Sequence, residues 1–159
     1  MSIEKTVIDL ARSAKTASST LAMCSTSQKN AALAGIADEL RAGADTLKAE
    51  NRKDLEAAKT AGLSDAMIDR LTITDATLTG MIDGLLAVAA LPDPVGAKSA
   101  TWIRPNGLEV ARMRIPLGVI GIIYESRPNV TVDAAGLCLK SGNAVVLRGG
   151  SESIHSNQA

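Results

Sequence analysis

Two short segments carry side chains whose types and spacing could bind an anion. One is the polar segment Tyr124 to Asn129, which contains Arg127, and the other is Arg148-Gly149-Gly150-Ser151. A guanidinium group is a forked donor that matches the oxygens of phosphate or carboxylate. Adjacent glycines allow a ligand to approach the backbone closely. The chemistry to expect here is recognition of a small anionic molecule.

Each arginine also has a plainer interpretation. Arg127 could pair with Glu125 or stay solvated, as surface charges commonly do. Arg148 could be a solvated residue at a simple turn after a strand. Spacing alone leaves both alternatives open.

Candidate nucleophiles and bases are few. Cys138 lies between two leucines and is predicted to be a small buried hydrophobic residue. Cys24 lies in a Ser/Thr-rich segment without a nearby base, and His155, the single histidine, has no Ser or Cys partner at a recognisable spacing. A surface position is expected for His155. The cysteine spacing suggests neither a metal site nor a disulfide framework.

Two predicted strands must position the anion-binding segments. Leu117 to Ile123 and Ala144 to Leu147 are continuous apolar runs, typical of parallel strands buried on both faces. The connection between them is long enough for parallel pairing and contains a helix predicted at Val130 to Lys140. Both polar segments then lie side by side at the carboxyl edge of the sheet, where open α/β sheets bind ligands.

The predicted connecting helix should be followed by a second one. Gly142 suits a left-handed cap after the first helix, and Ser151 suits the N-cap of the next. The apolar side chains that the first helix is expected to bury are Val132, Ala135, Leu137 and Leu139.

The first half of the chain is predicted to be helical, with a break at Gly62 to Asp65 and an end at Leu91 to Pro94. Three apolar stripes at helical spacing are expected to face the core. They are Ile3, Val7, Leu10 and Ala14; Leu33, Ile36, Leu40 and Leu47; and Leu78, Ile82, Leu85 and Ala89. A hairpin is predicted at residues 101–115, with Asn106-Gly107 supplying two positive-φ positions in its turn.

Composition limits the classes of partner. The 159 residues include 17 Lys plus Arg and 17 Asp plus Glu, so no basic surface for nucleic acid is predicted. Met1 to Arg12 lacks the apolar core of a signal peptide. The longest apolar run, Ile115 to Tyr124, is far shorter than the roughly 20 residues that span a bilayer. We therefore expect a cytoplasmic protein with free thiols and without nucleic-acid or membrane partners.

Residues 115–157 read IPLGVIGIIYESRPNVTVDAAGLCLKSGNAVVLRGGSESIHSN. Through the stretches YESRPNVT and KSGNAVVLRGG, this segment resembles the γ-glutamyl phosphate reductase family of the aldehyde dehydrogenase superfamily. The resemblance implies an α/β, aldehyde dehydrogenase-like fold: a helical amino-terminal half, a hairpin and the start of a Rossmann-like parallel sheet. Residues 1–159 would then be the amino-terminal part of an NADP-binding domain. Its parts would be 1–100 (mainly helical), 101–115 (hairpin) and 116–159 (strand-helix-strand-helix).

The resemblance also implies a reaction. This is the NADPH-dependent reduction of L-glutamyl 5-phosphate to L-glutamate 5-semialdehyde with release of phosphate, a step of proline biosynthesis. In the superfamily a cysteine thiolate carries the acyl group as a thioester. That nucleophile is expected beyond Ala159, in a domain that this chain lacks, so the chain alone is expected to be inactive. The complete enzyme is expected to be a homo-oligomer.

Site residues are implied position by position. Cofactor contacts are expected from Tyr124, Glu125, Arg148, Gly149, Gly150 and Ser151. Arg148 with the uncharged Ser151 fits a 2′-phosphate better than the superfamily's usual Lys and Glu do. Ser126 or Asn129 would supply the donor for the oxyanion, and Arg127 would bind the substrate.

Two alternatives remain at this point. One is another aldehyde dehydrogenase superfamily member with a different acyl or aldehyde substrate, against which the YESRPN stretch argues. The other is a non-catalytic assembly module, in which the hairpin and the helices form oligomer contacts.

Overall fold

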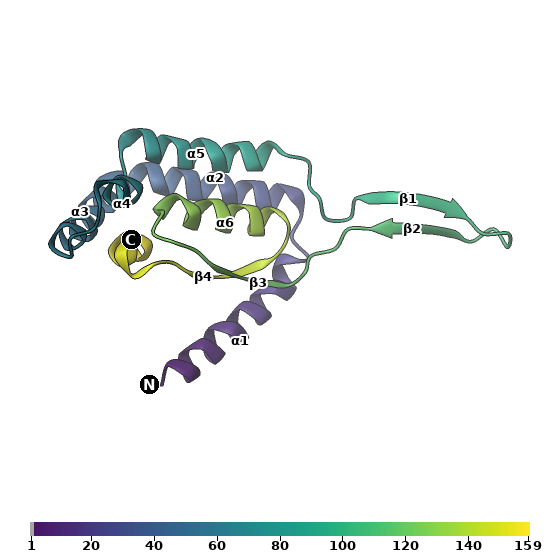
Figure 1. The fold of residues 1–159 in the computed structure, drawn as a ribbon. Coiled ribbons are helices and arrows are strands. Elements are labelled where there is room, and N and C mark those ends of the chain that lie inside the picture. Colours follow the sequence, from purple (N-terminus) through teal and green to yellow (C-terminus); the bar gives the residue numbers. More distant parts are fainter. Residues whose placement is uncertain (1) are drawn as a thin grey trace.

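The computed structural model describes residues 2–159, which form a helical body, a projecting hairpin and a small α/β unit (Figure 1). The elements are α1 (Ile3–Leu21), α2 (Thr26–Ala42), α3 (Ala44–Thr60), α4 (Asp65–Leu71), α5 (Asp75–Ala90), β1 (Lys98–Ile103), β2 (Glu109–Met113), β3 (Val119–Ile123), α6 (Pro128–Lys140), β4 (Ala144–Arg148), the 3-10 turn η1 (Ser151–Ser153) and α7 (Ile154–Gln158). The predicted order of helices, hairpin and strand-helix-strand-helix is confirmed.

Local capping explains several helix starts. Ser25 and Gln28 form a capping box at α2, and Thr74 accepts the amide of Thr77 at α5. The predicted break after α3 is confirmed, with Gly62 at a φ of 73°. The stripe predicted from Leu33 to Leu47 is divided, because the chain changes from α2 to α3 at Gly43. Periodicity alone did not reveal that corner.

The core lies between α2, α5 and α6, which form one layer of helices. Gly136 on α6 lets that helix approach α5, because a Cβ at this position would lie 2.8 Å from a methyl group of Leu85. The buried residues of the central cluster are Leu33, Ala37, Leu78, Met81, Ile82 and Leu85. The predicted core role of the α5 stripe is thus confirmed, while Ala89 lies at its edge.

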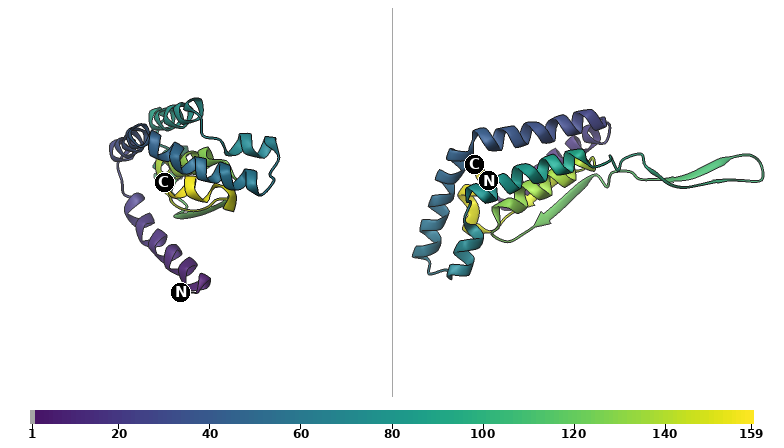
Figure 2. Two further views of the ribbon diagram at one scale, coloured as in Figure 1. Left: turned by 90° about the vertical axis from the view of Figure 1, so that its left-hand side faces the viewer. Right: turned by 90° about the horizontal axis from the view of Figure 1, so that it is seen from above.

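Helix α1 differs from the prediction. Its stripe was expected to face the core, but Ile3, Val7 and Leu10 are exposed, Ile3 by 85%. Only the carboxyl-terminal part of α1 lies against the sheet, and the amino-terminal part extends away from the body (Figures 1 and 2). An amphipathic pattern reports a face suited to burial, and does not name the surface that covers it.

Strands β3 and β4 pair in parallel, with Val119 opposite Ala144 and Ile123 opposite Arg148. Helix α6 lies on one face of this sheet and α1 on the other (Figure 1). The predicted burial on both faces is wrong at the ends of the first apolar run, because Leu117 and Ile123 are 86% and 81% exposed. Two strands and two helices are too few to cover these positions.

Helix α6 begins at Pro128, two residues before the predicted start, with proline in its first turn. Its buried face includes Ala134, Cys138 and Lys140, whereas Leu137, predicted to be buried, is 54% exposed. The left-handed cap at Gly142 is confirmed, with a φ of 71°. The predicted last helix is confirmed as α7, but its predicted N-cap is wrong, because Ser151 lies inside η1, which has no side-chain cap, and α7 follows Ser153.

The predicted face of α6 is confirmed in part: Val132 and Leu139 pack against the central cluster and Ala135 is half-buried, while smaller residues form the most buried face. Gly136 and Ala134 allow close contact with the helices above, whereas the larger Leu137 faces outward. Lys140 is buried because its ammonium group donates to the carbonyl oxygen of Ala89 at 2.9 Å and to Asn30 at 2.7 Å. It thereby binds the carboxyl end of α5, where cations are favoured.

The hairpin of β1 and β2 projects from the body (Figures 1 and 2). All of β1 is exposed. The amide of Gly107 donates to the carbonyl of Arg104, which closes a turn with Pro105 at its second position. The turn prediction is half wrong, because Gly107 has a φ of 82° while Asn106 does not adopt a positive φ.

A buried ion pair joins α2 to the segment after α5. Lys29 Nζ lies 2.5 Å from Asp93 Oδ2, and the Lys29 side chain is 2% exposed. Burial favours a higher pKa for Asp93, but hydrogen bonds from Lys29, Thr26 and the amide of Val95 outweigh it and lower the pKa. Asp93 is therefore a carboxylate at neutral pH.

No single helix within residues 2–159 is long and apolar enough to cross a membrane; α4 and α5 together reach that length and composition, but with a bend of 48° between them. In the same part of the chain, no group of three or more His, Cys, Asp and Glu side chains could hold a metal ion.

Candidate functional site at the carboxyl edge of the parallel sheet

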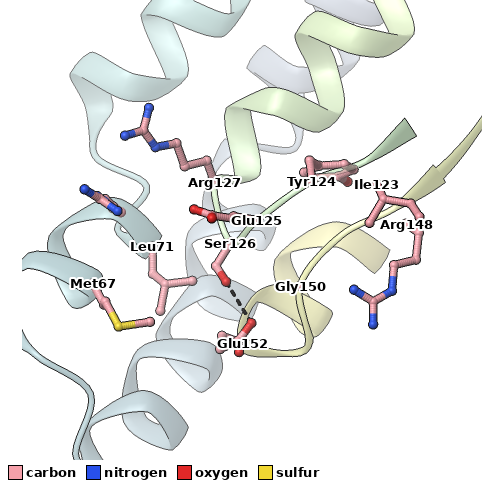
Figure 3. Close-up of a pocket in the computed structure, with 11 residues that line it drawn as sticks. Met67, Leu71, Ile123, Tyr124, Glu125, Ser126, Arg127, Arg148, Gly150 and Glu152 are labelled. Carbon is pink, nitrogen blue, oxygen red and sulfur yellow. Dashed lines mark hydrogen bonds between the residues drawn. The ribbon is translucent and has the colours of Figure 1, made fainter. Parts of the chain in front are cut away.

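The segments that follow β3 and β4 meet, as their position at one edge of a parallel sheet predicts. The amide of Tyr124 donates to the carbonyl of Arg148 at 3.1 Å, which continues the strand pairing into the loops. Beside them is a cavity of about 580 Å³ (Figure 3). Its lining residues are Met67, Arg70, Leu71, Ile123, Tyr124, Glu125, Ser126, Arg127, Arg148, Gly150 and Glu152.

A hydrogen bond joins the two loops across the cavity floor. Ser126 Oγ donates to Glu152 Oε2 at 2.7 Å, as the dashed line in Figure 3 marks. The pKa of Glu152 is lowered first by a hydrogen bond from its own backbone amide and then by the bond from Ser126. Gly150 lies directly beneath this pair, because a Cβ there would lie 2.5 Å from Glu152 and 2.6 Å from Ser126. A side chain at this position would therefore displace the hydrogen-bonded side chains of Ser126 and Glu152.

Three arginines line the cavity without ionic partners. Within residues 2–159, Arg70, Arg127 and Arg148 have no carboxylate oxygen within 4.0 Å. The alternative ion pair between Arg127 and Glu125 is thus wrong. Figure 3 shows Arg127 on the side of Met67 and Leu71, and Arg148 on the opposite side. The cavity has a cationic group at each end and can receive a ligand with two anionic centres.

A second cavity, of about 500 Å³, shares Arg148 and Tyr124 with the first. A chain of hydrogen bonds forms part of its wall: Tyr124 with Thr131, and Thr131 with Asn157. Gly149 faces this chain, and a Cβ there would lie 2.3 Å from Asn157 Nδ2. At both glycines after Arg148, a Cβ would therefore require neighbouring side chains to move.

The structure places most of the predicted site residues together. Ser126 and Arg127 line the first cavity, Ser151 lines the second, and Asn129 lines neither. Asn129 instead lies 3.4 Å from Asp133 Oδ2 on α6. The roles predicted for these residues remain predictions, but the grouping at one sheet edge is an observation.

The two thiols lie away from the cavities just described. Cys138 is buried on α6, and burial raises the pKa of its thiol. Cys24 contacts the carbonyl oxygen of Thr20 at 3.5 Å at the end of α1. His155 Nδ1 lies 3.9 Å from Glu50, on the partly exposed surface of α7, as predicted.

Sequence reasoning missed the wall that α4 contributes. Met67, Arg70 and Leu71 have the spacing of one helical face, but nothing in the sequence indicates which surface that face meets. Glu152 was also missed, because the residue expected to matter was its neighbour Ser151. Both omissions concern contacts between segments distant in the chain.

Helix α3 holds this wall in place through two buried polar side chains. Asn51 donates to the carbonyl of Leu71 at 2.8 Å and accepts the amide of Ile73 at 2.9 Å. One turn further on, Asp54 accepts the amides of His155 and Ser156 at 3.1 and 2.8 Å. These contacts fix α4, which lines the first cavity, and α7, which lines the second, to the same helix.

Taken together, a helical layer, a projecting hairpin and a ligand-sized cavity at the carboxyl edge of a parallel sheet define an aldehyde dehydrogenase-like fold. A probable aldehyde dehydrogenase from Listeria monocytogenes shares it, with a TM-score of 0.61 over 96% of this chain and 31% of that one. The sequence identity is 15%, so this likeness concerns the fold alone. No family model matches the chain.

Relatives with higher sequence identity share a single name. The chain is 60% identical over its whole length to the γ-glutamyl phosphate reductase of Desulfatibacillum aliphaticivorans, and 59% identical to that of Desulforapulum autotrophicum. It spans 38% of the length of each. The predicted resemblance to the γ-glutamyl phosphate reductase family is confirmed.

Solved structures agree with this result. The γ-glutamyl phosphate reductase of Thermotoga maritima superposes with a TM-score of 0.93 at 42% identity, over 95% of this chain and 36% of that one. The enzyme from Saccharomyces cerevisiae gives 0.89 at 35% identity, over 93% and 38%.

Proposed function

We propose that the chain is the amino-terminal, cofactor-side part of an NADPH-dependent γ-glutamyl phosphate reductase. The whole enzyme would convert L-glutamyl 5-phosphate to L-glutamate 5-semialdehyde and release phosphate, in proline biosynthesis. The observation that carries the proposal is the cavity between the β3 and β4 loops, with unpaired arginines at both ends. Acyl phosphate and nucleotide are both anions that such a cavity suits.

The residues of the cavity fit a phosphorylated nucleotide. Gly149 and Gly150 lie where a Cβ would require neighbouring side chains to move, and they let a ligand reach the backbone. Arg148 lies between the two cavities, where its guanidinium can bind a 2′-phosphate. When bound, the cofactor would supply the hydride. The residues of this chain would bind and orient it, together with the substrate.

The thiol that the reaction needs is, in this proposal, neither Cys24 nor Cys138. Cys138 is buried with a raised pKa, which disfavours the thiolate, and neither thiol lines the cavity. The protein is proposed to act in the cytoplasm as a homo-oligomer, with the exposed hairpin as a subunit contact. Its partner is the small-molecule substrate.

A chimaera tests the activity. Residues 1–159 would replace the matching residues of the Desulfatibacillum aliphaticivorans enzyme, which is 60% identical there. The chimaera is expected to reduce NADP⁺ when given L-glutamate 5-semialdehyde and phosphate, with turnover within about tenfold of the parent, because the site residues are retained. Folded chimaera without turnover, beside an active parent, would contradict the proposal.

The isolated chain provides the complementary test. It is expected to bind NADPH but to show no NADP⁺ reduction, because neither of its thiols is placed to be acylated. The same chain with Cys24→Ser and Cys138→Ser is the control. Turnover by the unmodified chain that the double variant loses would make one of these cysteines the nucleophile.

A further inference from the structure

Helix α4 contributes a third arginine to the cavity, in addition to the arginines of the two loops. Arg70 lines the first cavity together with Met67 and Leu71 of the same helix. The helix also carries Asp65 and Asp69, yet neither carboxylate lies within 4.0 Å of Arg70 in the described part of the chain. Arg70 therefore reaches the cavity with its donors available.

The backbone beside Arg70 is held rigidly. Leu71 is fully buried, and its carbonyl accepts a hydrogen bond from Asn51, which is 2% exposed. Asn51 also accepts the amide of Ile73, so one side chain fixes both ends of the segment after Arg70. The backbone that carries Arg70 is thus fixed at the wall of the cavity that its side chain lines.

The cavity has two distinct ends. Arg127 lies on the side of Met67 and Leu71, the α4 side, whereas Arg148 lies on the opposite side (Figure 3). The hydrogen bond between Ser126 and Glu152 runs between them in this view. The exposed side chain of Met67 adjoins the α4 end, so this end suits an anion carried on a short aliphatic chain.

We propose that Arg70 and Arg127 together bind an oxyanion group of the substrate at the α4 end of the cavity, while Arg148 serves the cofactor at the other end. The inference rests on the proposed function and extends it. The group bound could be the carboxylate of the glutamyl unit or the phosphoryl group, since both are oxyanions that a guanidinium binds. Arg70 is thus a substrate-binding residue supplied by the helical half of the chain.

Direct binding to the purified protein tests the inference. Inorganic phosphate and L-glutamate serve as separate probes, followed by isothermal titration, with NADPH titrated in parallel. Arg70→Gln is expected to weaken one of the two probes by about tenfold or more, because a charge-assisted contact is lost, and to leave NADPH binding unchanged. Arg52→Gln, which removes an exposed arginine of α3 that does not line the cavity, is the matched control.

The probe that is weakened identifies the group. Loss of phosphate binding assigns Arg70 to the phosphoryl group, and loss of L-glutamate binding assigns it to the carboxylate. Unchanged binding of both probes in Arg70→Gln, or a wild-type protein that binds neither, overturns the inference. If Arg70→Gln unfolds by circular dichroism, Arg70→Lys gives the same comparison with the charge retained and the forked geometry lost.

Kinetics of the chimaera separate this inference from the proposed function. In the direction of NADP⁺ reduction, Arg70→Gln should raise the KM for phosphate or for glutamate 5-semialdehyde by about tenfold while the KM for NADP⁺ is unchanged. A wild-type chimaera without turnover would count against the proposed function. An active chimaera in which Arg70→Gln changes neither substrate KM would count against Arg70 alone.

Discussion

Arg148 is the residue through which the choice of cofactor can be tested. Its side chain lines both cavities; within residues 2–159 no carboxylate oxygen lies within 4.0 Å of it, although its charge contributes to the lowered pKa of Glu152. Arg148→Glu should weaken NADPH by about 1.5–3 kcal/mol, or roughly 10- to 100-fold, and NADH much less, because only NADPH carries the 2′-phosphate. Fluorescence titration with both nucleotides measures this. An unchanged NADPH/NADH preference would remove Arg148 from the cofactor site.

The steric role of a second single residue, Gly150, can also be tested. A Cβ at this position would lie 2.5 Å from Glu152 Oε2 and 2.6 Å from Ser126 Oγ, so Gly150→Ala should displace these side chains and break their hydrogen bond. A loss of about 1–3 kcal/mol in the free energy of unfolding and weaker NADPH binding are expected. Gly121→Ala is the control, because a Cβ at that position meets nothing within 4 Å. Equal behaviour of the two variants in urea unfolding would contradict the steric account.

Single residues were predictable where their chemistry is local. Arg127 and Arg148 lie in the segments that follow the two predicted strands, as do Gly149 and Gly150. Their position at the sheet edge could therefore be derived from the sequence. Arg70 could not be found in this way, because it reaches the cavity from a helix more than fifty residues earlier. The sequence contains no local signal for such a contact.

Among the elements, prediction succeeded for type and order, and failed for the surfaces that elements meet. The three stripes have equal helical spacing, yet one packs in the core, one is divided at Gly43, and the one on α1 is exposed. On α6 the same rule chose Leu137, while close packing against Leu85 required the face with Gly136. Small size at the contact thus set the most buried face of α6, although the predicted Val132 and Leu139 also pack against the core.

Shortening an apolar side chain to alanine should affect stability differently in the hairpin and in the helical core. Ile103 on β1 is 75% exposed, whereas Leu33 on α2 is fully buried. Ile103→Ala should change the free energy of unfolding by no more than about 0.5 kcal/mol, and Leu33→Ala should lower it by about 2–5 kcal/mol. Urea unfolding of a dilute sample compares the two. A large cost at Ile103 would indicate that the hairpin is packed in solution, as in an oligomer.

The stability of the whole molecule should depend on pH through Asp93. Because its pKa is lowered in the folded state, its contribution is present above the usual value of 3.8 and is lost as the pH falls below that value. Asp93→Asn leaves Lys29 buried without a carboxylate, which should cost about 3–5 kcal/mol at neutral pH. The difference from the wild type should shrink in acid, since below pH 3.8 the unfolded wild-type chain takes up a proton at Asp93 that the folded protein resists, which lowers the wild-type stability.

Urea unfolding at pH 7 and pH 3 measures that difference. Asp9→Asn is the control, because Asp9 and Arg12 form an exposed pair at 3.8 Å. It should cost less than about 0.5 kcal/mol at either pH. A deficit for Asp93→Asn that stayed constant with pH would contradict a role for its ionised form.

The attachment of α7 to α3 has a consequence for hydrogen exchange. A helix of five residues is too short to be stable by itself, and its amides normally exchange rapidly. Here the amides of His155 and Ser156 donate to Asp54, which is 2% exposed and lies about a hundred residues earlier. Both amides should therefore be protected to nearly the same degree as the amides of α3. In Asp54→Ala they should exchange rapidly, while the amide of Ile73, held by Asn51, should keep its protection.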